Sequence, residues 1–189
     1  MPAGPSEAES LARRLLEMSG ARWQHVRGVA ARTHELTHGH PDRNELAAAA
    51  WLHDVGYADE VSTTGFHPLD GARYVASRGF APDVVGLVAY HSGADVEAGE
   101  RGLSEELRLI DRPKQALLDI LILADMTTSP IGQRVGVDAR IVEILGRYDD
   151  SHPVHRAVAR SQHELRAAAH RAAVSLGLPS ADEGLPFTG

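Results

Sequence analysis

The 189-residue chain contains no cysteine. This absence excludes disulfide bonds, thiolate nucleophiles and cysteine-ligated zinc or iron–sulfur sites, so any metal must be held by imidazole and carboxylate groups. Lysine is nearly absent too, since Lys114 is the only one, and a phosphate site must therefore rely mainly on arginine. The net charge of -7 argues against a nucleic-acid scaffold as partner, because such proteins normally carry a basic face.

Long hydrophobic runs are also missing. No apolar run approaches the roughly 20 residues that cross a bilayer, and residues 1–10 lack the basic and apolar regions of a secretory signal. We therefore expect a cytoplasmic protein without a membrane partner. No stretch alternates apolar and polar residues as a strand would, so the sequence predicts an all-α, single-domain helical bundle of about seven to nine helices.

The expected helical domain spans residues 10–176. Residues 1–9 are small, polar and proline-containing and are predicted to be a disordered tail, and residues 177–189 a flexible one. Residues 94–104 are rich in glycine and acids, which predicts a loop of the kind that covers a site. The segment from Pro113 is apolar on nearly every side and predicts the most buried helix, with Asp125 as its one inward acid.

A histidine and an aspartate stand side by side at the end of an alanine-rich helical stretch. They are His53 and Asp54, and Gly56 is the expected C-cap of that helix. Burial of such a pair without partners costs several kcal/mol, so the pair should be hydrogen-bonded, ion-paired or metal-bound. Other predicted helix ends carry one inward polar residue each, namely His25, His67, His91 and Asp125. Imidazole and carboxylate groups that converge from separate helices suit borderline divalent cations.

The order of these motifs resembles one known family. The motifs are RWQH (22–25), HD (53–54), HPLDGA (67–72), AYH (89–91) and LAD (123–125). The series is similar to the HD-domain superfamily of metal-dependent phosphohydrolases over residues 21–130, and the HxxxGA element is typical of members with two metals, including hydrolases of symmetrical dinucleoside tetraphosphates. The resemblance implies one metal at His25, His53, Asp54 and Asp125. It implies a second at His67 and His91, with Asp54 as the bridge.

The resemblance also implies an activity. One or two divalent ions, such as iron, manganese, zinc or magnesium, would activate a bridging hydroxide to attack phosphorus in a small nucleotide-like or other phosphorylated metabolite. Asp54 and Arg22 are the expected catalytic residues, with Arg22 near the substrate phosphate. Arg73, Arg101 and Lys114 are further candidates for holding that phosphate. Nothing in the sequence predicts the oligomeric state.

Three alternatives stay open. Some HD-fold proteins with this ligand set are mixed-valence di-iron oxygenases, and a non-catalytic nucleotide-binding regulatory domain would keep the same fold. The third alternative comes from residues 34–38, whose letters HELTH match the HExxH motif of zinc peptidases. Arg32, Thr33 and Thr37 around that motif suggest a polar surface turn, so we regard the peptidase as the least favoured.

Overall fold

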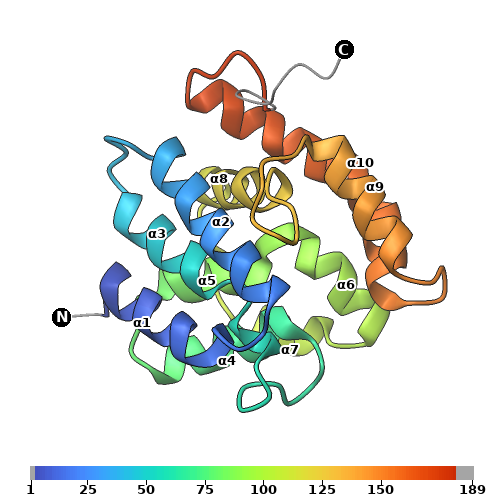
Figure 1. The fold of residues 1–189 in the computed structure, drawn as a ribbon. Helices are drawn as coiled ribbons and strands as arrows, with labels where there is room; N and C mark the ends of the chain where they lie inside the picture. The colour runs from blue at the N-terminus through green and yellow to red at the C-terminus, as the bar shows by residue number, and fades with distance from the viewer. Residues whose placement is uncertain (1–2, 182–189) are drawn as a thin grey trace.

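The computed structural model describes residues 3–181, and every regular element in that range is a helix, which confirms the predicted all-α class (Figure 1). The helices are α1 (Pro5–Leu16), α2 (Ala21–Leu36), α3 (Arg43–Leu52), α4 (His67–Ser77), α5 (Pro82–Tyr90), α6 (Ala94–Arg101), α7 (Ser104–Arg108), α8 (Gln115–Met126), α9 (Val137–Arg147) and α10 (Pro153–Ser175), with two 3-10 turns, η1 (Val55–Tyr57) and η2 (His91–Gly93). None of these described helices combines the length and the apolar character that a membrane crossing requires.

Helix α8 forms the centre of the bundle. Every residue from Leu117 to Met126 is buried, as its apolar sequence predicts, and the helix packs against α2, α3, α5 and α10. Helices α9 and α10 lie together along one side of the molecule, and α1 and α3 lie together toward the other (Figure 1). A second acid of α8, Asp119, is also buried, which the sequence did not indicate. It is paired with Arg171 of α10 at 2.7 Å.

The N-terminal prediction is wrong for residues 5–9, because they form the start of α1. Pro5 takes the first helical position, where its fixed backbone angle suits a helix, and Glu7 accepts a bond from the amide of Gly4 at 2.7 Å. Ala8 and Ala12 are fully buried against α3. Small side chains four residues apart thus make a packing stripe that a search for large apolar residues overlooks. Of the predicted C-terminal tail, residues 182–189 lie outside the described residues.

The predicted loop at residues 94–104 is instead mostly helical, because α6 and the start of α7 fall within it. Gly93 and Gly102 lie at the two ends of α6 with positive φ, where glycine is favoured. Ala94 and Ala98 face the core and are almost fully buried. Of the two glycines in the predicted loop, Gly102 is therefore a helix cap and Gly99 lies within α6.

Gly56 does not cap α3, which ends at Leu52. It lies in η1, pressed against the start of α4, and a Cβ atom at this position would lie 2.0 Å from the carbonyl oxygen of His67. Only glycine permits so close an approach of two backbones. The contact brings the segment after His53 and Asp54 directly against the helix that begins at His67.

Candidate metal centre

The structure brings the six predicted metal ligands to one place in the bundle. His25 lies on α2, His53 and Asp54 directly follow α3, His67 begins α4, His91 follows α5, and Asp125 lies in the last turn of α8. Five of them are buried, and the His67 side chain is 14% exposed. Side chains that are distant in the sequence therefore share one apolar interior.

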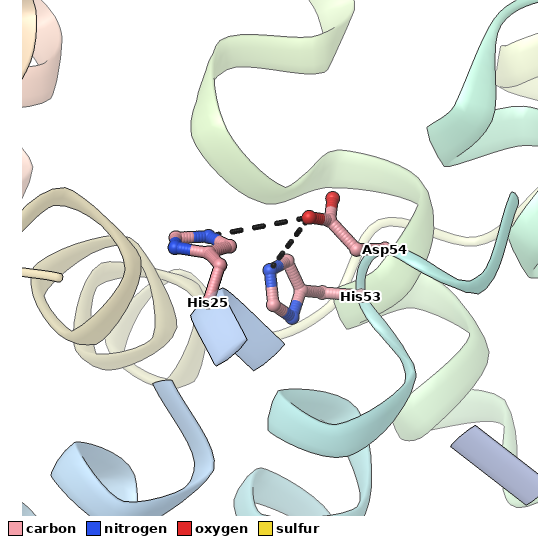
Figure 2. A group of neighbouring side chains, drawn as sticks. All are labelled: His25, His53 and Asp54. Carbon is pink, nitrogen blue, oxygen red and sulfur yellow. Dashed lines mark ion pairs between the residues drawn. The ribbon is translucent and has the colours of Figure 1, made fainter. Parts of the chain in front are cut away.

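Five of the six predicted ligands, all but Asp125, form two groups that share Asp54. Donor atoms of His25, His53 and Asp54 all lie within 4.8 Å of one another, and the same holds for Asp54, His67 and His91. Oδ2 of Asp54 faces His25 at 4.0 Å and His53 at 3.5 Å, and both lines in Figure 2 end on that oxygen. Oδ1 faces His67 at 3.4 Å and His91 at 3.9 Å. One carboxylate therefore offers a separate oxygen to each imidazole pair, as a bridging ligand does.

Backbone carbonyl groups determine which ring nitrogens face the cluster. In three of the histidines Nδ1 lies at hydrogen-bonding distance from a carbonyl oxygen, which can only accept. The pairs are His25 with Ser129 (3.1 Å), His53 with Ala50 (2.8 Å) and His91 with Val88 (2.7 Å). Nδ1 therefore carries the proton in the neutral ring, and Nε2 turns a lone pair toward the cluster.

These lone pairs are directed at other electron-rich atoms. Nε2 of His25 lies 3.0 Å from Oδ1 of Asp125, and Nε2 of His91 lies 3.2 Å from Nε2 of His67. Nε2 of His53 is buried and has no hydrogen-bond partner among residues 3–181. Buried acceptors without donors are costly, and a cation among them removes that cost. Imidazole nitrogen and carboxylate oxygen fit borderline divalent ions, so the cluster can hold metal.

The protonation states of the cluster also suit metal binding. Burial lowers the pKa of His53 to about 4, and it lowers the pKa of His67 well below the ordinary histidine value. Burial would raise the pKa of Asp54, but the charge of Arg22 and the neighbouring imidazoles hold it well below its usual range. Neutral imidazoles beside an ionised carboxylate are the forms that bind metal ions.

Asp125 lies at the edge of the first group and is held from two sides. Its Oδ1 contacts His25, and its Oδ2 accepts a hydrogen bond from the hydroxyl of Ser92. Ser92 has φ 51°, a left-handed conformation that is uncommon outside glycine. Sequence reasoning missed Ser92. The only hint in the sequence was that this serine lies between His91 and a glycine.

Arg22 reaches the shared carboxylate from α2. Its Nη1 lies 2.6 Å from Oδ2 of Asp54, and its guanidinium carbon lies 3.8 Å from the ring centroid of Tyr57. The Tyr57 ring stacks on His67 at 4.0 Å, so one aromatic side chain supports both the arginine and a predicted ligand. Tyr57 had no sequence signal beyond its closeness to His53 and Asp54.

The family comparison agrees with this geometry. A family model, described as the HD domain, matches residues 22–125, from Arg22 to Asp125. The chain belongs to the HD domain family. The resemblance inferred from the motif order is thus confirmed, while the catalytic roles of Asp54 and Arg22 stay predictions. Searches of curated proteins and of solved structures found no match.

The three further arginine and lysine candidates for phosphate lie away from the HD centre. Arg73 is exposed, Arg101 is paired with Glu97 at 2.7 Å, and Lys114 is 3.5 Å from Asp42. None of the three lines the cavities at the metal ligands, of about 80 and 250 Å³. The arginines that do line both cavities are Arg22, Arg140 and Arg147. The last two come from α9, beyond the matched residues.

The HExxH segment of the HD domain is a surface feature. His34, Glu35 and His38 are exposed, and in the described chain they belong to no group of side chains that could hold a metal. Glu35 is ion-paired with Arg134, so it is not directed at a water between the histidines. The expected polar surface turn is wrong in one respect, because Arg32, Thr33 and Thr37 are buried.

Asp70 fastens the loop that leads into His67. Its two oxygens accept bonds from the amides and hydroxyls of Thr63 and Thr64 and from the amide of Gly65, at 2.7 to 3.2 Å. Burial would raise the pKa of Asp70, but these bonds lower it. Sequence reasoning took only His67 from the HPLDGA motif as a site residue and missed this aspartate, which fastens the loop before that histidine.

Replacement of Asp70 by asparagine is expected to lower the free energy of unfolding by about 2 kcal/mol at pH 7, since an amide turns a donor toward other donors. The pKa of Asp70 is lower in the folded protein than in the unfolded chain, so its stabilisation is present above the unfolded value and fades as the pH falls. Urea unfolding should show that the difference in the free energy of unfolding between wild type and Asp70→Asn shrinks below about pH 4. A difference that stays constant to pH 3 would contradict this role.

Proposed function

We propose that this HD domain is a metal-dependent phosphohydrolase that acts on a small nucleotide-like or other phosphorylated metabolite. The observation that carries the proposal is that each oxygen of Asp54 faces a different pair of imidazoles, three of which turn an Nε2 lone pair inward. Two divalent ions held there would provide a nucleophile at neutral pH and offset the charge on phosphoryl oxygens. A module that only binds nucleotide has no need of both halves of such a site.

Arg22 is suited to hold the phosphoryl group. It lines both cavities at the cluster, and its guanidinium presents paired donors that match two phosphoryl oxygens. The ring of Tyr57 lies against the guanidinium plane and restricts its orientation. Burial would lower the pKa of Arg22, but Asp54 and Tyr57 raise it, so the positive charge is kept at any working pH. His53, with its low pKa, stays neutral and available as a ligand.

Two measurements on protein purified without chelators test the proposal. Metal per chain is determined first, and the protein is then given a panel of nucleotides and sugar phosphates with manganese, iron, zinc or magnesium. We expect metal-dependent release of inorganic phosphate from at least one substrate. Oxygen consumption on an added substrate, with iron bound and no phosphate released, would instead support the oxygenase alternative and refute the hydrolase.

A further inference from the structure

We propose that helix α9 gives this site a second anion-binding subsite, in which Arg140 and Arg147 hold another phosphoryl group of the same substrate. The inference rests on the proposed phosphohydrolase function and narrows its substrate to a phosphoanhydride, a chain of at least two phosphoryl groups. It concerns residues outside the 22–125 match, so membership of the HD domain family does not by itself predict it.

A cavity beside the metal ligands carries the argument. It has a volume of about 250 Å³ and is lined by Ser19, Ala21, Arg22, His25, Pro130, Arg140 and Arg147. Among the described residues, three guanidinium groups and one imidazole line it and no carboxylate does, although the whole chain has a net charge of -7. Concentrated positive charge on an acidic protein selects for anionic ligands.

This cavity adjoins the metal cluster, because four residues line both it and the cavity of about 80 Å³ that Asp54 lines. They are Arg22, His25, Arg140 and Arg147. Arg22 contacts the shared carboxylate and serves the phosphoryl group at the metals. Arg140 and Arg147 come from a different helix and share the carboxylate of Glu143, so the ester of a single phosphate would give them no further acceptor. A phosphate chain that runs from the metals into the larger cavity gives each arginine an acceptor.

Arg140 provides a second, independent observation. Arg140 is only 6% exposed, and its Nε is buried without a hydrogen-bond partner in the part of the chain that the structure describes. Its Nη1 donates to Glu143, and Nη2 of Arg147 lies 2.9 Å from the same carboxylate oxygen. One carboxylate therefore serves two guanidinium groups, which leaves a positive charge at the cavity and an unsatisfied donor. A phosphoryl oxygen would supply the missing acceptor and the missing negative charge.

Calorimetric titration of manganese-loaded, full-length protein with inorganic phosphate and with pyrophosphate tests the subsite. We expect pyrophosphate to bind the wild type at least tenfold more tightly than phosphate. Arg147→Ala should weaken pyrophosphate at least tenfold and phosphate less than twofold. Arg140→Lys keeps the charge and loses the planar fork, so it should weaken pyrophosphate severalfold with phosphate again unchanged. Metal content is measured after each titration, so that chelation by pyrophosphate is not taken for binding.

Arg166→Ala is the matched control, since Arg166 is an exposed arginine paired with Asp138 at 2.6 Å and lines neither cavity. It should change neither affinity. Equal affinity of the wild type for the two anions, or equal weakening of both by Arg147→Ala, would overturn the subsite. A preference for pyrophosphate in a protein that hydrolyses no phosphate compound would support the subsite and refute the proposed function. Failure of the subsite and failure of the phosphohydrolase function therefore give different results.

Discussion

Replacement of Asp54 by alanine is expected to remove both metal ions from the protein. Oδ2 of this aspartate faces one imidazole pair and Oδ1 faces the other, so a single substitution takes a carboxylate from two centres at once. Without Asp54, the pair His67 and His91 is left without a carboxylate from its group, and the pair His25 and His53 keeps Asp125 at its edge. Because divalent ions in buried sites need several charged or polar ligands, both affinities should collapse. Phosphate release should fall with them.

Metal per chain, measured by plasma mass spectrometry on protein purified without chelators, tests this expectation. His91→Ala should lose mainly the second ion, since His91 faces only Oδ1 of Asp54. Asp119→Ala is the control, because Asp119 is another buried carboxylate but pairs with Arg171 outside the cluster. It should melt at a lower temperature and keep its metal. Full occupancy in Asp54→Ala would refute the bridging assignment.

The second large effect separates the HD centre from the HExxH segment. His53→Ala should lower phosphate release from a generic aryl phosphate by more than about 100-fold, because it removes a buried ligand from the metal nearest Oδ2 of Asp54. Glu35→Gln should keep nearly the wild-type rate, since Glu35 is exposed and ion-paired with Arg134. Both rates are expressed relative to wild type in the same metal.

Peptidase chemistry would produce the opposite pattern, because the glutamate of an HExxH site activates the attacking water. Glu35→Gln would then abolish activity on a peptide substrate, and His53→Ala would leave that activity intact. Circular dichroism of both variants shows whether a loss reflects chemistry or unfolding. Similar losses of phosphatase activity in two folded variants would contradict both accounts.

The residues of the cluster could be predicted from the sequence because they occur in a recognisable order, and all of them but His25 stand at or next to a helix end. A helix end places a polar side chain where the backbone can turn away from the core, so His53 and Asp54 can be buried without breaking α3. The apolar run in α8 likewise identified the central helix and its inward Asp125. These features depend on local composition, which a single sequence contains.

The features that could not be predicted depend on which helix packs against which. The sequence around Gly56 predicts a helix cap, and only the structure shows that this glycine contacts the backbone of His67. Arg140 is one of many arginines until α9 is placed beside the cluster. Ala8 becomes a core residue only because α1 packs on α3. Each of these roles comes from tertiary contacts between distant segments, and no local pattern records them.

Anomalous diffraction at the absorption edge of the bound metal, from crystals of protein purified without chelators, tests the central claim most directly. The account predicts two peaks about 3.5–4 Å apart, one on each side of the Asp54 carboxylate. His25, His53 and Asp125 should ligate the first, and His67 and His91 the second, at about 2.0–2.2 Å. Metal found elsewhere in an active protein, or a single ion that Asp54 does not touch, would contradict it.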